Sequence, residues 1–246
     1  MRFPPLPPVV KNLLILNILI WLAMALVPAL DSSLTRMFAI HYFSSPGFNI
    51  TQLFTYMFLH GNLTHLFFNM FALVMFGGII ERTMGSKHFL FYYISCGIFA
   101  ALVQMAAYTV MLSKYTQFIS PEQYDYIVRE GWELIRQGYN FNIPPEWGTI
   151  NALVNGPMVG ASGAIYGIIL AFGMLYPNQP VYLFFIPVPI KAKWLVIGYG
   201  VIELTSGLGN IVDNVAHFAH LGGMIAGVLL ILYWKKKGIF NNHWFL

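Results

Sequence analysis

Residues 156–167 read Gly156-Pro157-Met158-Val159-Gly160-Ala161-Ser162-Gly163-Ala164-Ile165-Tyr166-Gly167, and the predicted architecture is built outward from them. This stretch puts one hydroxyl, Ser162, among small residues near the start of an apolar run. Pro157 suits the first turn of a helix, and the glycines on either side of the serine would let a second helix approach its backbone. Small residues and a serine in a membrane helix more often serve packing and backbone hydrogen bonding. A catalytic interpretation therefore needs a base and oxyanion donors from elsewhere in the chain.

The composition is that of an integral membrane protein. Hydrophobic residues make up 58% of the 246 residues and charged residues only 9%, and the mean hydropathy is +0.66. The chain is long enough for several spans of about 20 residues each. The net charge of +4 comes from Lys and Arg near span ends, which indicates membrane orientation and no nucleic-acid partner. Cys96 is the only cysteine, which excludes an internal disulfide and a Cys-based metal site.

Apolar periodicity predicts an all-α membrane protein with a six-transmembrane-helix bundle. The expected spans are 13–30, 54–80, 88–112, 157–176, 193–208 and 215–234. The first run could also be a signal peptide, because Val27-Pro28-Ala29 resembles a cleavage site, but its length favours retention. We therefore expect an N-terminal segment (1–12), a membrane domain (13–234) and a C-terminal tail (235–246).

The segments between the spans are less regular. Residues 31–52 are expected to form a loop near the membrane interface. Residues 113–155 form a polar loop, within which 122–137 has the apolar spacing of a short surface helix. The apolar stretch 181–190 is short and contains Pro187 and Pro189, which indicates an interfacial turn.

The distribution of basic residues predicts the orientation. Nine of the 13 Lys and Arg residues fall on one side of the six-span layout and four on the other. The richer side is expected to be cytoplasmic, which places both termini inside and the 113–155 loop outside. We expect an integral multi-pass protein of a bacterial cell (inner) membrane.

Polar side chains within the spans are candidates for function, because burying them in lipid is costly. They include His60, His65, Asn69, His217 and His220. Counted from the outer ends of their helices, Ser162 lies roughly 8 Å deep and His220 roughly 9 Å deep, at 1.5 Å per residue. The glycines that follow His220 at helical spacing would let the two helices pack closely, so the imidazole could accept the serine proton and Tyr166 could stack on it.

Two residues near this predicted pair have open roles. Glu203 is expected in the same outer half of the membrane, and it is either a third catalytic member or a neutral or hydrogen-bonded carboxyl within the bundle. We favour the second interpretation and hence a Ser-His dyad. His217 is an alternative base, one turn nearer the surface.

The combination of Gly160-Ala161-Ser162-Gly163 with Tyr166, Ala219-His220-Leu221-Gly222-Gly223 with Gly227, and His60, His65 and Asn69 resembles the rhomboid family of intramembrane serine proteases. The resemblance covers residues 54–234. It implies that Ser162 is the nucleophile and His220 the base. It also implies that His65, Asn69 and the Ser162 backbone N–H form an oxyanion hole, with Tyr166, Gly160 and Gly163 in support. The expected substrates are single-span membrane proteins, met within the lipid bilayer.

Three other interpretations were weighed. The polar residues could be interhelical hydrogen-bonding contacts, which any one of them alone would suggest. The histidines could relay protons or bind zinc in a transporter or metalloprotease, but no internal repeat, HExxH motif or acidic ligand beside them was found. A catalytically inactive relative would be expected to lack Ser162 or His220. We therefore predict no metal and no cofactor.

Overall fold

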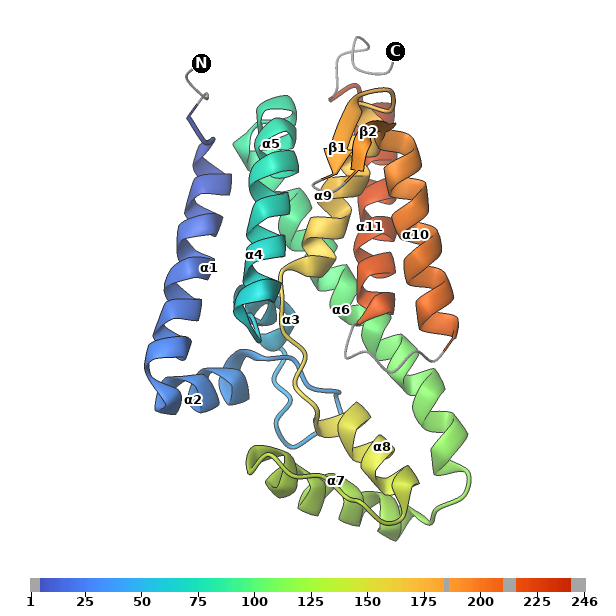
Figure 1. Ribbon diagram of the computed structural model, residues 1–246. Helices are drawn as coiled ribbons and strands as arrows, with labels where there is room; N and C mark the ends of the chain where they lie inside the picture. The colour runs from blue at the N-terminus through green and yellow to red at the C-terminus, as the bar shows by residue number, and fades with distance from the viewer. Residues whose placement is uncertain (1–4, 184–185, 210–215, 240–246) are drawn as a thin grey trace.

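The structure is a computed structural model that describes residues 5–183, 186–209 and 216–239. Within these ranges the chain is mainly helical (Figure 1). The helices are α1 (Pro8–Leu26), α2 (Pro28–Phe38), α3 (Gln52–Thr55), η1 (Tyr56–Phe58), α4 (Leu63–Ala72), η2 (Leu73–Gly77), α5 (Gly78–Met84), α6 (Ser86–Thr116), α7 (Pro121–Arg136), α8 (Pro145–Asn155), α9 (Ser162–Leu175), α10 (Ala192–Leu208) and α11 (His217–Lys236); the strands are β1 (Pro180–Leu183) and β2 (Ile186–Lys191).

Four helical segments among the described residues are long and apolar enough to cross a membrane: Pro8–Leu26, Leu63–Met84, Ser86–Thr116 and His217–Lys236. Large apolar side chains on these segments remain exposed, among them Leu19, Phe91, Val110 and Leu229, as expected for a surface that meets lipid. Figure 1 shows that α1 begins and α11 ends at the same end of the bundle, while α7 and α8 lie at the opposite end. The chain is therefore a multi-pass membrane protein.

The other two predicted spans are shorter. α9 has 14 residues and α10 has 17, so length alone does not establish six membrane-crossing helices. α9 is packed on all sides, and eleven of its residues are buried, whereas only Ala192, Leu195, Val196 and Glu203 are buried on α10. α9 is thus a central helix, and α10 packs along a single face.

The prediction that the fourth span starts at Pro157 is wrong, because the helix begins at Ser162 itself. The preceding residues are extended and are paired with distant backbone: Met158 and Ile40 exchange hydrogen bonds of 2.9 and 3.0 Å, and the Gly160 N–H donates to Tyr56 O at 3.0 Å. Gly160 has φ +128°, a conformation that other residues rarely adopt and that stops a helix from starting earlier. Ser162 is therefore the first residue of α9. Figure 1 shows that this helix starts partway along the bundle.

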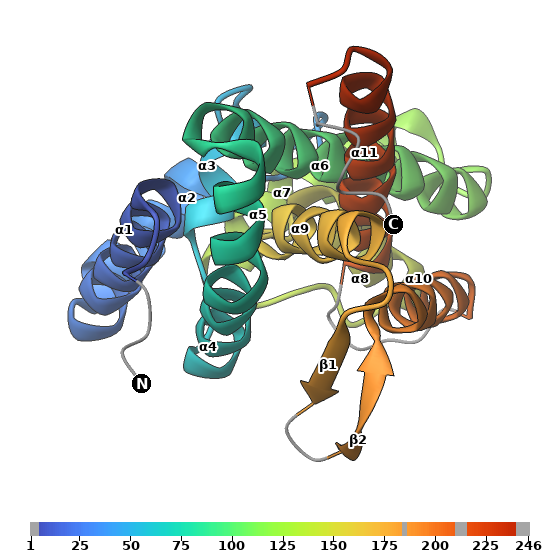
Figure 2. The same cartoon turned by 90° about the horizontal axis from the view of Figure 1, so that it is seen from above.

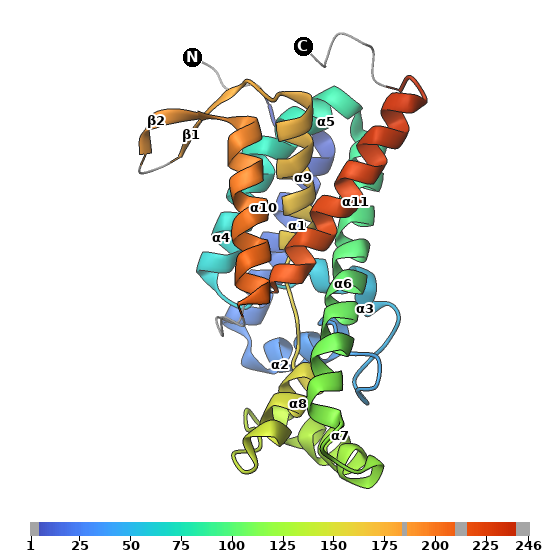
Figure 3. The same cartoon turned by 90° about the vertical axis from the view of Figure 1, so that its right-hand side faces the viewer.

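The interfacial turn predicted over 181–190 is instead a two-stranded antiparallel hairpin. Val181 pairs with Ile190 and Pro180 with Lys191. The hairpin projects sideways from the bundle beside α10 (Figures 2 and 3). Pro187 and Pro189 do not prevent this pairing because a two-stranded sheet has only edge strands, where a missing N–H can be tolerated.

The polar region beyond the bundle is more helical than expected. α7 confirms the predicted surface helix, but α2 and α8 lie in segments expected to be loops. Side chains link this region to the chain that leads to Ser162: the Asn155 amide donates to Asn151 Oδ1 at 2.8 Å, and the Ser45 hydroxyl donates to Asn155 Oδ1 at 2.7 Å. The end of α8 is therefore fixed just before the extended segment begins.

Glycines determine how closely the central helices pack. A Cβ on Gly223 of α11 would lie 1.9 Å from the Gly163 carbonyl oxygen of α9, and one on Gly167 would lie 2.6 Å from Cys96 Sγ of α6. No side chain fits at these separations, so α9 and α11 meet backbone to backbone. This contact brings the N-terminal turns of both helices together.

Candidate active site

The site forms where the N-terminal turns of α9 and α11 meet. The Ser162 hydroxyl and His220 Nε2 are 2.8 Å apart, across 58 residues of sequence. Ser162 is partly exposed, whereas only 7% of the His220 surface is accessible. A hydroxyl within hydrogen-bond distance of a buried imidazole is the geometry required for activating a serine nucleophile.

Stacking on Tyr166 orients the His220 ring. The Tyr166 ring, one helical turn after Ser162, stacks on it with centroids 4.1 Å apart and planes 6° apart. At the start of α11, the Ala219 N–H is shared between the Ala216 carbonyl and Gln104 Oε1, both at 2.9 Å, which ties this helix to α6. The imidazole is therefore held in one orientation relative to Ser162.

Glu203 of α10 joins the same cluster. Its Oε2 lies 2.6 Å from His217 Nδ1 and 3.0 Å from His220 Nδ1, and its Oε1 accepts a short hydrogen bond from the Tyr166 hydroxyl. The contact with His220 has the distance of a hydrogen bond but not its angle, since Nδ1 has no hydrogen-bond partner among the described residues. The carboxylate therefore faces two histidines and a tyrosine in a buried place.

The predicted oxyanion residues lie on the other side of Ser162. The His65 ring covers Gly160, where an added Cβ would come within 2.6 Å of its Cε1. The Asn69 Nδ2 group donates one hydrogen bond to the His65 carbonyl at 2.8 Å, which leaves its second N–H. His60 is buried against His65, with ring centroids 5.0 Å apart, and neither of its ring nitrogens has a described partner.

Glu203, His217 and His220 are also the one group of three such side chains, within the described ranges, whose ligand atoms all lie within 4.8 Å of one another. Zinc accepts histidine nitrogens and carboxylate oxygens of this kind. A metal on Nδ1 of His220 would, however, leave the ring proton on Nε2, which is the nitrogen that faces Ser162. Metal binding there is incompatible with His220 acting as the base.

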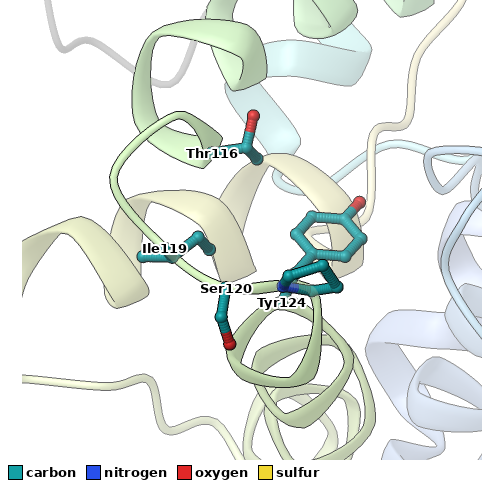
Figure 4. Close-up of a pocket in the computed structure, with 5 residues that line it drawn as sticks. Thr116, Ile119, Ser120 and Tyr124 are labelled. Carbon is teal, nitrogen blue, oxygen red and sulfur yellow. The ribbon is translucent and has the colours of Figure 1, made fainter.

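A surface hollow of about 320 Å³ lies elsewhere, where α6 passes into α7. Figure 4 shows its lining, which includes Thr116, Ile119, Ser120 and Tyr124. It contains none of the residues considered above and no charged side chain. The hollow is therefore separate from the candidate site at the α9–α11 contact.

Sequence reasoning undervalued Glu203. It was expected to be a hydrogen-bonded carboxyl, which agrees with its contacts, but its approach to both His217 and His220 was not foreseen. The sequence offered one signal: Glu203 is the only acidic residue in a mainly apolar helix, at the depth expected for the serine. His217 contacts the carboxylate through Nδ1, whereas His220 is the histidine beside Ser162.

Most of the chain is similar to known proteins. The Rhomboid domain family model matches residues 47–237. RHOMBOID-like protein 12, mitochondrial, of Arabidopsis thaliana is 29% identical over 192 residues, which are 77% of this chain and 47% of that protein. Rhomboid protein 1, mitochondrial, of Saccharomyces cerevisiae is 26% identical over 179 residues, which are 73% of this chain and 40% of that protein. The chain spans about half the length of the curated relatives that it matches.

These relatives correct the expected location. All four curated relatives that match are named as mitochondrial proteins, which contradicts the expectation of a bacterial cell membrane. Lys and Arg positions could predict which ends of the helices share a side, but they carry no information on which membrane holds them. The family itself follows from a match over most of the chain: this protein belongs to the rhomboid family.

Proposed function

We propose that this protein is an intramembrane serine endopeptidase that uses a Ser162–His220 dyad. The observation that carries the proposal is the 2.8 Å distance between the Ser162 hydroxyl and His220 Nε2. Membership of the rhomboid family supports it, because the family suggests intramembrane protease activity. Interhelical hydrogen bonding, the alternative, would not require Ser162 to remain partly exposed.

The chemistry is acyl transfer. Ser162 Oγ attacks the carbonyl carbon of the scissile peptide while its proton passes to His220 Nε2. The same nitrogen then gives that proton to the leaving amine, and the C–N bond breaks. Water attacks the resulting ester with His220 again as base, which releases the acid product and restores the serine. Each step uses one ring nitrogen, so the other must keep its proton throughout.

The oxyanion is stabilised from the start of α9. The first N–H groups of a helix have no acceptor within the helix, and the helix dipole adds positive potential there. The Ser162 N–H is the first of these groups, and the free N–H of Asn69 and the ring of His65 complete the set of donors. Donors of this kind typically contribute about 10²-fold or more to the rate.

The proposed substrates are membrane-spanning segments of single-span proteins, cut toward the end of the bundle where α7 and α8 lie. Their backbone must leave the helical state first, because a carbonyl paired within a helix is shielded from attack. Small or helix-breaking residues near the cut are therefore expected. We further propose that α1, α4 to α5, α6, α9, α10 and α11 form six membrane crossings, and the names of the relatives favour a mitochondrial membrane.

The test is cleavage of a model single-span substrate in liposomes by the wild-type protein and by Ser162→Ala, His220→Ala and His217→Ala. We expect Ser162→Ala and His220→Ala each to lower kcat at least about 10³-fold, as for other hydrolytic pairs. A fluorophosphonate probe should label the wild type and not Ser162→Ala. Cleavage that survives Ser162→Ala removes the nucleophile, and loss in His217→Ala but not in His220→Ala reassigns the base.

A further inference from the structure

The buried carboxylate of Glu203 has no part in the two-residue mechanism. Glu203 is 5% exposed, although it is the only acidic residue on α10. It shares the buried face of that helix with Ala192, Leu195 and Val196, which pack against the bundle. A charge in such a place is strongly destabilising unless partners compensate it, and its retention then calls for a role.

We propose that Glu203 is a positioning residue for His220, which it orients for the reaction with Ser162; this rests on the proposed protease function. Oε2 lies 3.0 Å from Nδ1 of His220, on the far side of the ring from Ser162. An acceptor oxygen and a nitrogen lone pair would repel each other at this distance. The carboxylate therefore keeps the proton on Nδ1, which leaves Nε2 unprotonated to accept the serine proton.

Two other residues hold the carboxylate in place. The Tyr166 hydroxyl donates to Oε1, and His217 Nδ1 lies 2.6 Å from Oε2. Tyr166 also stacks on His220, so this one side chain orients both the His220 ring and the Glu203 carboxylate. The angle between Glu203 and the Nδ1–H is poor in the free enzyme, and such bonds often tighten only when substrate is bound. In this arrangement His217 holds the Glu203 carboxylate and does not act as the base.

The same carboxylate favours the charged form of the ring. When His220 takes the serine proton it becomes an imidazolium, and the negative charge beside Nδ1 stabilises that state in a site with little water. No bond forms or breaks at Glu203. Its effect should therefore appear in kcat and in the pH dependence of kcat, and much less in KM.

The experiment compares the wild type with Glu203→Gln, Glu203→Asp and Glu203→Leu. The readouts are substrate cleavage and the rate of fluorophosphonate labelling at Ser162 between pH 5 and 9. We expect Glu203→Gln to lower kcat at least tenfold with KM changed less than threefold. The acidic limb of the pH–rate profile should move to lower pH, because the imidazolium loses its counter-charge. Glu203→Leu should lose more activity than Glu203→Gln, because leucine has no acceptor that keeps the His220 proton on Nδ1. Glu203→Asp, which retains a carboxylate, should keep more activity than either.

Glu81→Gln is the matched control, because Glu81 is also a buried carboxylate but has no contact with His220. It should keep the wild-type pH–rate profile and kcat within twofold. The inference is overturned if Glu203→Gln, folded by its thermal transition, keeps kcat within twofold and an unshifted acidic limb. Absence of labelling in the wild type would instead remove the protease proposal, so the two failures are distinguishable. If Glu203→Leu does not fold, the isosteric Glu203→Gln alone decides the matter.

Discussion

Two buried carboxylates in this protein have opposite surroundings. Glu81, 2% exposed, accepts hydrogen bonds from the Val9 and Val10 N–H groups at 3.0 and 2.8 Å and from the Ser86 hydroxyl at 2.7 Å. It therefore satisfies unpaired amides at the start of α1 and ties that helix to α5 and α6. Glu203 instead faces two imidazoles and a phenol.

The difference indicates what each charge does. Backbone amides cannot gain or lose protons in the working range of pH, so the partners of Glu81 give it a purely structural role. The partners of Glu203 are side chains that can donate and accept protons, and one of them, His220, lies beside Ser162. Burial alone thus says little about function, whereas the chemistry of the partners separates a helix anchor from part of a catalytic site.

The largest expected effect comes from moving His220 without changing any polar group of its site. Gly223→Ala would place a methyl group 1.9 Å from the Gly163 carbonyl oxygen, which forces α11 away from α9. We expect a loss of stability of about 3 kcal/mol, at the upper end for overpacking, and at least a 100-fold loss of activity. Thermal unfolding in detergent and substrate cleavage measure the two effects.

Gly200→Ala is the matched control for that change. Its methyl group would meet only Met224 Cε, at an ordinary 3.5 Å, on the loosely packed α10. Alanine also favours a helix over glycine, by about 0.5–1 kcal/mol. The control should therefore be neutral or slightly stabilising. Equal effects of the two substitutions would show that the backbone contact between α9 and α11 does not position the site.

The second prediction concerns the structural carboxylate. Glu81→Ala removes the acceptor of two amides and one hydroxyl, and we expect a loss of about 2 kcal/mol, the upper end measured for a helix cap. The kcat of the folded fraction should stay within twofold. A thermal melt and cleavage assays on the same preparation test this. A large loss of kcat with an unchanged melting temperature would abolish the distinction between the two carboxylates.

The difference between these residues also explains what could be predicted from the sequence. The approach of Ser162 to His220 followed from short motifs and glycine spacing, because residues at helical intervals share a face whatever the rest of the fold does. The contacts of Glu203 depend on the rotation of α10 against two other helices. That rotation is set by packing, and a mainly apolar helix with a single acidic residue does not specify it.

The start of α9 could not be predicted for a related reason. Local preferences allow a helix from Pro157, but hydrogen bonds from Ile40 and Tyr56, more than 100 residues earlier, hold this segment extended. Tertiary contacts thus override local propensity. The hairpin was missed because Pro187 and Pro189 indicated a break. The family and the multi-pass membrane class were within reach, since both depend on motifs and composition.

The third prediction separates the two contacts of Tyr166, its stacking on His220 and its hydrogen bond to Glu203. Tyr166→Phe keeps the ring that stacks on His220 but removes the hydrogen bond to Glu203. We expect about a fivefold loss of kcat, close to 1 kcal/mol, because His217 still holds the carboxylate. Tyr199→Phe, which alters the neighbouring ring 5.9 Å from Tyr166, should stay within twofold. Activity equal to wild type in Tyr166→Phe would limit the role of this residue to stacking.

The smallest expected effect concerns His41, a third buried ionisable residue, which lies beyond the bundle near α7 and α8. Its Nδ1 donates to the Asn155 carbonyl at 3.0 Å, its Nε2 has no partner among the described residues, and Trp132 packs against the ring. Burial lowers the pKa of His41 below its ordinary value of 6.5. The Asn155 carbonyl only partly offsets this effect of burial, and no carboxylate lies beside the ring among the described residues.

A lowered pKa fixes the sign of the pH effect. The folded protein binds this proton less readily than the unfolded chain, so the contribution of His41 to stability is complete above about pH 6.5 and is lost as pH falls below that value. We expect wild-type stability to drop between pH 7.5 and pH 5, and to drop less in His41→Gln, which cannot titrate. Thermal unfolding of both proteins at the two pH values measures these changes in stability. Comparing the two proteins removes the contribution of the other histidines, which both proteins contain. An identical pH dependence in both proteins would mean that the region around α7 and α8 accommodates a charged His41 without loss of stability.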